Sequence, residues 1–387
     1  MKLALFFLLV FVNISLFSQT KKTIKDIVSI NGYVKFMPSL SFVDGDNILT
    51  NNYIHNRINT SFFLSDKLSA KFELRNRIYY GETVTNTPNY SKLIDADTGF
   101  IDLSTFIIDK KSIVFLSNID RLYLDYQAEK WEVRIGRQRI NWGINLAWNS
   151  NDLFNSYNIA NFDYQERPGA DAVRFQYYTG DFSHAEIAYK PGKTFDESIL
   201  AGLYKFNKWK YDIQFVGGNY YTDFTLGTGW AGNIKNAGFK GEATYFHSKS
   251  NFADTTGSAN ISLATDYSFK NGLYLNVSYL YNSLGKSSAN LVGGSLFIDG
   301  GLSPKNLMPT KHSYLAQIMG QFNPRVQGSL IAIYGQGMNL LFLMPSVDYE
   351  IKANWNLSLI GQIVFADNQN KFQNMGNSLY LRLWYSF

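Results

Sequence analysis

Hydrophobic and polar residues alternate along most of the chain, in segments separated by short polar turns. In the segment 53–64, for example, the side chains of His55 and Arg57 share one face, and those of Ile54 and Ile58 share the other. Alternation with a period of two indicates a β-strand with one polar and one apolar face. Segments of about ten residues are long enough to cross a bilayer as tilted strands.

The links between these segments also follow a pattern, in which short turns such as Ser65-Asp66-Lys67 alternate with longer links such as 81–117, 141–168 and 285–310. Short turns at one end and long loops at the other are typical of an outer-membrane barrel. The sheet must close on itself, because an open edge would leave unpaired amides in the hydrocarbon. The sequence therefore predicts an all-β protein, a transmembrane antiparallel β-barrel of about 18 strands (or 16), with long external loops. The predicted segments are 27–38, 52–64, 67–80, 118–128, 130–140, 169–178, 181–190, 198–207, 209–219, 222–233, 235–247, 257–269, 271–284, 311–323, 325–335, 339–351, 354–366 and 376–387.

The N-terminal residues do not fit this alternation. A positive start, Met1-Lys2, precedes an apolar run that ends near Ser18. This order predicts a secretory signal peptide over residues 1–18, cleaved after Ser18. Asn13 and Ser15 interrupt a run that is already short for a membrane-spanning helix. We expect residues 19–387 to form a single barrel domain.

The C-terminal segment, NSLYLRLWYSF, places Leu381, Leu383, Tyr385 and Phe387 on one face. It resembles the C-terminal strand signature of bacterial outer-membrane barrels, which their assembly machinery recognises. This resemblance implies that Tyr385 and Phe387 are the assembly signal. It also implies that the cleaved protein lies in the outer membrane of a Gram-negative bacterium, in contact with its lipid. The alternative is a soluble β-protein whose last strand is amphipathic.

Composition narrows the function classes. Aromatic residues make up 16% of the chain, and charged residues only 17%, against about a quarter in most soluble proteins. The chain has no cysteine, which excludes disulfides and thiolate metal sites. Its formal charge of +5 is spread along the sequence, so we do not expect it to bind nucleic acid.

Three motifs resemble chemical sites, but none has the context that its chemistry requires. Gly227–Gly232 matches G-x-G-x-x-G but lies within a predicted strand, where glycines lining a crowded barrel wall explain it better than a nucleotide. The segments 44–47 and 95–99 resemble parts of calcium loops without the distal Glu. His247 and Ser248 leave a membrane-embedded lipase as an alternative, because catalytic triads are assembled in space. We predict no enzyme activity, no metal site and no cofactor.

Arginines gather on the polar faces of the first six segments and the last. If the apolar faces turn outward, these side chains point into the lumen together with Glu73, Asp125 and Glu132. One interpretation is a salt-bridged wall that stiffens the barrel. The other is a basic track for anionic or polyhydroxylated solutes, because guanidinium groups bind carboxylate and phosphate in a fork. The predicted lumen arginines are Arg57, Arg75, Arg77, Arg121, Arg134, Arg174 and Arg382.

The stretch 131–157 begins as a strand and then leaves the alternating pattern after Gly136. A long polar and aromatic excursion follows. Water-exposed loops seldom carry aromatic residues at this density, so we predict that 141–168 folds into the lumen and narrows it. Trp142 and Trp148 of this excursion, with Arg139 beside it, are predicted to lie in the lumen or at its constriction.

The sequence RIGRQRINWG, residues 134–143, resembles the alginate-export and related porin-like outer-membrane families, which carry G-R-Q on a strand followed by a W-G turn. The block 148–155 is similar to a version found in porin-like proteins of the Bacteroidetes. The resemblance implies a barrel with an arginine-containing lumen, with Arg137 and Gln138 at its wall or constriction. It gives no substrate. From the barrel pattern and the lumen arginines together we predict a channel for passive diffusion of small hydrophilic solutes, with a bias toward anionic or polyhydroxylated ones. Two alternatives stay open: an occluded barrel subunit of a secretion or uptake complex, and an outer-membrane enzyme acting on lipid or glycan.

Overall fold

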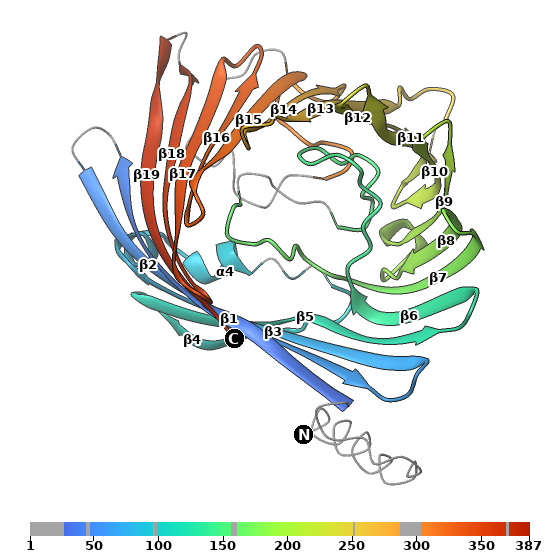
Figure 1. Ribbon diagram of the computed structural model, residues 1–387, viewed down its shortest axis with the longest axis horizontal. Coiled ribbons are helices and arrows are strands. Elements are labelled where there is room, and N and C mark those ends of the chain that lie inside the picture. Colours follow the sequence, from blue (N-terminus) through green and yellow to red (C-terminus); the bar gives the residue numbers. More distant parts are fainter. Residues whose placement is uncertain are drawn as a thin grey trace.

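The computed structural model describes residues 27–43, 47–95, 97, 99–155, 161–250, 252–286, 303–368 and 371–387. Its strands form one antiparallel sheet that closes through the pairing of the first strand with the last (Figure 1). The predicted signal peptide and the acidic segment 44–46 lie outside the described residues.

Each of the 18 predicted segments overlaps one strand of the barrel, which confirms the predicted fold class. Every barrel strand pairs with its two neighbours, so the ring of barrel strands closes on itself. The barrel strands are β1 (Val28–Val43), β2 (Asn47–Phe63), β3 (Leu68–Gly81), β5 (Ile113–Gln127), β6 (Trp131–Gln138), β7 (Ala170–Gly180), β8 (Ser183–Lys190), β9 (Ile199–Lys208), β10 (Tyr211–Tyr220), β11 (Asp223–Ile234), β12 (Ala237–Ser248), β13 (Ser258–Ser268), β14 (Tyr274–Asn282), β15 (His312–Asn323), β16 (Val326–Gly335), β17 (Leu340–Lys352), β18 (Trp355–Asn368) and β19 (Lys371–Ser386).

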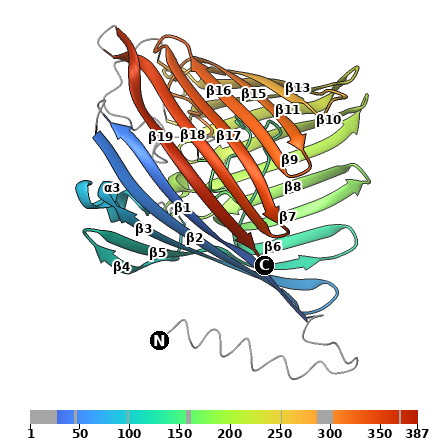
Figure 2. The ribbon, with the colours of Figure 1, turned by 60° about the vertical axis from the view of Figure 1, so that its left-hand side comes forward.

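The link between β3 and β5 contains elements that the alternation did not predict. These are the short helices α3 (Glu82–Asn86) and α4 (Tyr90–Ile94) and the strand β4 (Ser104–Lys110). β4 pairs with residues 113–118 of β5. β6 pairs with residues 122–127 of the same strand, so it does not reach the part of β5 that β4 covers. α3 and β4 lie at the outer edge of the barrel (Figure 2). A further short helix, η2 (Phe195–Glu197), lies between β8 and β9. Among the described residues, no helix is long and apolar enough to span a bilayer.

Side chains alternate between the two sides of the wall. On β1, Tyr33 and Lys35 are buried on the lumen side, while Val34 and Phe36 are exposed on the outside. At the closing seam, the backbone of Phe387 exchanges two hydrogen bonds with Gly32, each 3.0 Å long. The apolar outward positions are those that a bilayer would cover.

Besides α4, which lies inside the ring of strands (Figure 1), two further links turn into the barrel. The first connects β6 to β7 and crosses the interior of the barrel, as predicted (Figure 1). We call the described part of residues 139–169 the inserted loop. A second segment, 303–311, also turns inward, and the buried side chain of Asn282 donates to the carbonyl oxygen of Met308 at 2.6 Å. The sequence predicted only the first of these insertions.

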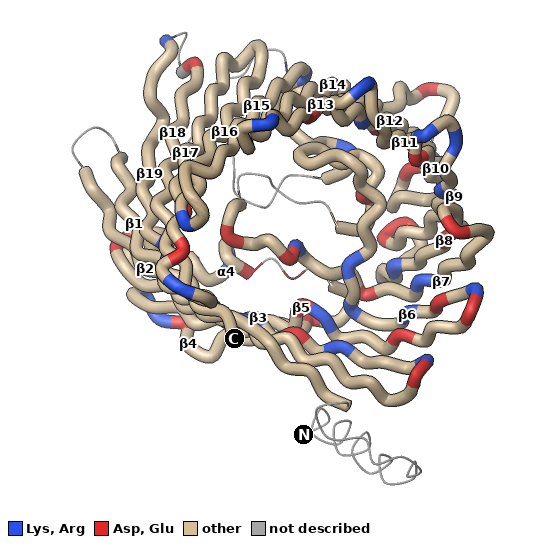
Figure 3. The backbone as a smooth tube through the Cα atoms, viewed as in Figure 1, with Lys and Arg blue, Asp and Glu red and all other residues tan. Residues whose placement is uncertain are grey.

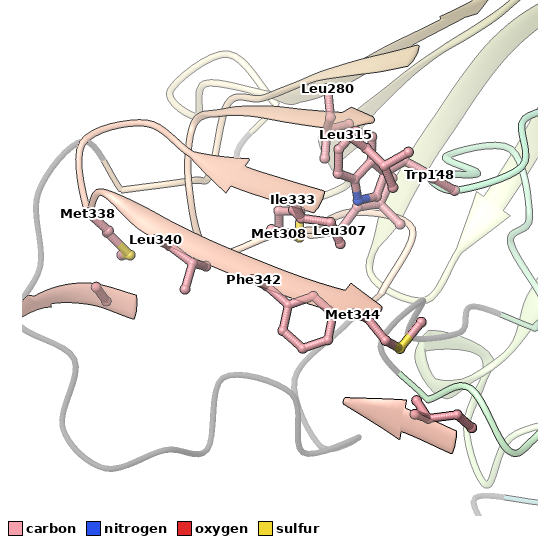
Figure 4. Close-up of a cluster of buried hydrophobic side chains, with 13 residues drawn as sticks. Trp148, Leu280, Leu307, Met308, Leu315, Ile333, Met338, Leu340, Phe342 and Met344 are labelled. Carbon is pink, nitrogen blue, oxygen red and sulfur yellow. The ribbon is translucent and has the colours of Figure 1, made fainter. Parts of the chain in front are cut away.

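The two insertions meet on an apolar patch of the inner wall (Figure 4). There Trp148 of the inserted loop packs with Leu307 and Met308 of the second segment. The strands beneath them, β14, β15 and β16, carry no Asp, Glu, Lys or Arg. Charged positions are dense along β5 to β8 instead (Figure 3). The lumen is therefore charged on one side and uncharged on the other.

Candidate functional site: a lumen narrowed by the inserted loop

The first attachment of the inserted loop is Glu242 on β12, whose side chain is 0% exposed. One carboxylate oxygen accepts hydrogen bonds from the backbone N–H groups of Ile144 and Asn145, at 2.5 and 3.0 Å. The other accepts from the N–H group of Asn151 at 2.9 Å. A buried carboxylate is tolerated only when its charge is met by donors, and here the loop backbone supplies them.

The polar side chains of the loop add contacts to the same wall. Asn145 donates to the hydroxyl of Ser262 on β13 at 2.6 Å. Asn151 donates to the carbonyl oxygen of Thr228 at 3.0 Å and accepts from the hydroxyl of Thr244 at 2.7 Å. The asparagines of the 145–155 region therefore fix the loop to β11, β12 and β13.

Glycines on β11 make room for this approach. A Cβ atom at Gly227 would lie 2.3 Å from the side-chain oxygen of Asn151. A Cβ atom at Gly229 would lie 2.7 Å from the Cδ1 atom of Ile144. These glycines belong to the G-x-G-x-x-G motif, and the close contact between loop and wall accounts for them.

The two tryptophans of the loop are packed rather than free in the pore, at 4% and 3% exposed. The indole N–H group of Trp142 donates to Glu186 on β8 at 2.6 Å, and its ring meets Phe154 edge-on at 5.0 Å between centroids. Trp148 lies in the apolar cluster already described. Both predicted constriction residues therefore hold the loop in place.

The second attachment is Asp163, which reaches the seam where β1, β2 and β19 meet. Its carboxylate lies 3.2 Å from the ammonium nitrogen of Lys35 and 2.7 Å from the Nδ1 atom of His55. The guanidinium of Arg382 lies 3.7 Å away. The inserted loop is thus held at two distant parts of the wall, β11–β13 and the seam.

Most of the predicted lumen arginines are paired with carboxylates. Arg57 binds both Glu73 and Asp120. Arg134 and Arg174 share Glu132, at 3.0 and 2.5 Å. Arg134 also binds Asp125 at 2.6 Å, and Arg174 lies 3.9 Å from Glu186. These pairs form the salt-bridged part of the wall.

Residues 137–139 occupy the end of β6. Arg137 follows the outward-facing Ile135 by two positions, and it binds Asp97 and Asp171, each at 2.7 Å. Gln138 donates to the carbonyl oxygen of Ala172 at 2.9 Å. Arg139 donates to Asn141 at 3.1 Å. The structure places the Arg137 guanidinium within the wall, between two carboxylates. Asp97, from the predicted calcium-like segment, is thus engaged by an arginine.

Three neighbouring arginines on β3 and β5 differ from the others, because no carboxylate among the described residues lies within 4.0 Å of their nitrogen atoms. Arg75 stacks on the ring of Tyr164 at 3.6 Å and donates from Nε to His55. Arg77 donates to the amide oxygen of Asn118 at 2.7 Å. Arg121 donates to backbone carbonyl oxygens, including that of Glu166 at 2.8 Å. Their acceptors are neutral, so their positive charges are not cancelled by a direct ion pair.

Sequence reasoning missed Glu242, Asp163, Asp120 and the buried Lys35. Alternation does place Lys35 and Glu242 on inward faces, so a search for charged residues on those faces would have found them. Nothing in the sequence marks Asp163 among the other loop residues. Its partners Lys35 and His55 lie more than a hundred positions away in the chain.

In the part of the chain that the structure describes, no group of three His, Asp or Glu side chains is arranged to hold a metal ion. Both ring nitrogens of His247 are engaged, by the hydroxyl of Tyr245 at 3.2 Å and the carbonyl oxygen of Phe252 at 2.8 Å. Neither of these partners of the imidazole belongs to its neighbour Ser248.

The fold matches solved outer-membrane porins. OccK5 (OpdH) of Pseudomonas aeruginosa superposes with a TM-score of 0.59 at 7% identity, covering 94% of this chain and 99% of that one. OccK9 (OpdG) of the same organism gives 0.58 at 8% identity, covering 93% and 98%. The outer membrane protein OpdK, also from Pseudomonas aeruginosa, gives 0.57 at 7% identity, covering 93% and 98%.

This chain has a porin-like fold.

At such low identity the likeness concerns the fold alone. No protein-family model matches the chain, and no match was found among curated proteins. The resemblance of residues 134–143 to the alginate-export families therefore stays a prediction.

The buried carboxyl of Asp152, within the inserted loop, predicts a pH dependence. Burial raises the pKa of this carboxyl to about 8. The charges of Arg139 and Arg167 lower the pKa, but less than burial raises it, and the charge of Glu242 adds to the rise. A carboxyl whose pKa is raised by folding stabilises the packed loop fully at acidic pH, and this contribution is lost as the pH rises through about 8. Single-channel recordings across this range should show conductance or current noise increasing with pH. Asp152→Asn should remove the dependence, and an unchanged pH profile in this variant would assign it elsewhere.

Proposed function

We propose that the protein is a channel of the Gram-negative outer membrane for passive diffusion of small hydrophilic solutes. The observation that carries this proposal is the inserted loop, held inside a closed barrel by Glu242 on one side and Asp163 on the other. A polar loop bound at two parts of the wall narrows a lumen without needing a separate plug. The apolar outward faces support a position in a bilayer, and the porin-like fold supports the same class of function.

We further propose that the channel favours anions. Arg75, Arg77 and Arg121 lie side by side on paired strands and have neutral acceptors, so they supply a local positive field. A narrow lumen with low-dielectric walls concentrates such a field. A second structure of OpdK, which shares the fold at 8% identity, was solved with vanillate, a hydroxylated carboxylate. This supports anions of that kind as solutes to be tested.

Reversal potentials in a salt gradient test this preference. The wild-type channel should favour anions, and Arg75→Gln with Arg77→Gln should weaken that preference by removing two positive charges that have no direct ion pair among the described residues. The preference should also fall at high salt, where the screening length drops to about 3 Å at 1 M.

The matched control is Arg75→Lys with Arg77→Lys, which keeps both charges and should keep the anion preference even if the guanidinium contacts are altered. A cation-selective wild type, or a glutamine variant as anion-selective as the wild type, would show that these arginines serve the wall and not the solute.

A further inference from the structure

At the seam of the barrel, where β1 meets β2 and β19, three basic side chains surround one carboxylate of the chain itself. Lys35 on β1 and His55 on β2 are both 0% exposed, and Arg382 on β19 is 7% exposed. β1 pairs directly with both β2 and β19, so the three side chains come from adjacent strands. Lys35 and His55 contact the carboxylate of Asp163, which belongs to the inserted loop and not to the wall. Arg382 lies between two carboxylates, 3.7 Å from that of Asp163 and 3.6 Å from that of Asp348.

The orientation of His55 follows from its neighbours. The Nε2 atom lies 3.2 Å from the Nε atom of Arg75, and a guanidinium can only donate. Nε2 is therefore the acceptor, so the proton lies on Nδ1 and is donated to Asp163 at 2.7 Å. Lys35 is directed to the other carboxylate oxygen at 3.2 Å, with its ammonium group 4.5 Å from the ring centres of Tyr33 and Trp384. The site thus contacts both oxygens of one carboxylate.

Asp163 is held in its anionic form. Burial by itself would raise the pKa of its carboxyl, but the hydrogen bond from His55 and the charges of Lys35 and Arg382 outweigh burial and lower the pKa. Removing a charged partner from a buried ion pair strongly destabilises the charge that is left behind. Lys35 would be such a charge, because Asp163 is its ion-pair partner among the described residues. An anion at this position pairs with Lys35 whether or not that anion belongs to the chain.

We propose that Lys35, His55 and Arg382 form a carboxylate-binding site of the channel, that Asp163 fills it when no solute is present, and that the carboxylate of a passing solute replaces Asp163. This inference rests on the proposed channel function and adds a specific solute contact to it.

An internal competitor suits a channel because a buried site with two cations would otherwise hold an anion for too long. A tethered group competes at an effective concentration that is of order millimolar for a short flexible link. Binding is then weak enough for release, as conduction requires. The backbone near Asp163 has further contacts, since Tyr164 donates to Asp120 at 3.0 Å and Phe162 packs on Tyr380 at 5.1 Å between ring centroids. Displacement of the carboxylate is therefore a local change and does not release the whole loop.

Acetate block of single channels tests the competition, with chloride at equal ionic strength as the reference. In the wild type, acetate should interrupt the current only at high concentration. In Asp163→Asn the site lacks its internal anion, so half-maximal block should need about tenfold less acetate. Adding Lys35→Met to that variant should abolish the sensitive block. If acetate acts equally on the wild type and Asp163→Asn, or if Lys35→Met leaves the block unchanged, the site is structural only.

A second measurement keeps the test decisive if Asp163→Asn does not fold. The chain has no cysteine, so Phe162→Cys gives a single reporter beside the native Asp163. Acetate should increase the rate at which a neutral maleimide labels this cysteine, and chloride at the same ionic strength should not. An acetate-independent rate would contradict displacement of Asp163. If the wild type passes no current but labelling still responds to acetate, the channel proposal fails while the binding site stands.

Discussion

Replacing Glu242 by leucine should raise the single-channel conductance clearly and leave the barrel assembled. The carboxylate accepts three backbone N–H groups of the inserted loop, from Ile144, Asn145 and Asn151. Leaving a buried N–H group without an acceptor costs about 1–3 kcal/mol. The loop can regain these hydrogen bonds only by moving toward water, which widens the lumen. Leucine fills nearly the same volume, so the wall itself should stay packed.

Asp266→Leu is the matched control for this change. Asp266 lies on the neighbouring strand β13 and pairs with Lys240 at 3.0 Å, on the wall and not on the loop. Its replacement should leave the conductance at the wild-type value. A Glu242→Leu channel that also conducts like the wild type would mean that the loop does not set the aperture.

Replacing residues 144–160 by a short Gly-Ser linker should give the largest conductance of any variant described here. This change removes the packed Trp148 and the asparagine contacts to β11 and β13 together with the chain that crosses the lumen. It should be made together with Glu242→Leu, because the buried carboxylate would otherwise lose all three of its backbone donors. Conductance in a planar bilayer measures the effect.

The control for the linker is the same Gly-Ser replacement in the 191–198 link, which contains η2. There the conductance should not change. Equal conductance of the 144–160 variant and the wild type, with assembly preserved, would exclude this loop as the constriction.

The barrel was predictable from sequence because every strand has lipid on its outer face and a polar lumen on its inner face. Lipid outside and a polar lumen inside impose the same alternation on all 18 barrel strands, so each leaves a local signal. β4, α3 and α4 leave no such signal, because their link lies outside that repeating pattern. The inserted loop was detectable by its aromatic residues, since Trp142 and Trp148 would be unsuitable in water.

The partners of individual charges were not predictable in the same way. Alternation gives the face of Lys35 or Glu242, but not the loop residue that meets it. Asp163 and the backbone N–H group of Asn151 are brought to these side chains by the path of the loop, and that path has no periodic pattern. Alternation places Arg137 on the same face as Ile135, but it gives no sign of Asp97 and Asp171, which hold its guanidinium.

The single-channel current of the wild-type protein in a planar bilayer tests the central claim most directly. The claim is that this barrel conducts small ions through a lumen narrowed, but not closed, by the inserted loop. We expect discrete current steps at a conductance below that of the 144–160 linker variant. Folded and inserted wild-type protein that passes no current would contradict this account and would favour an occluded barrel subunit of a secretion or uptake complex.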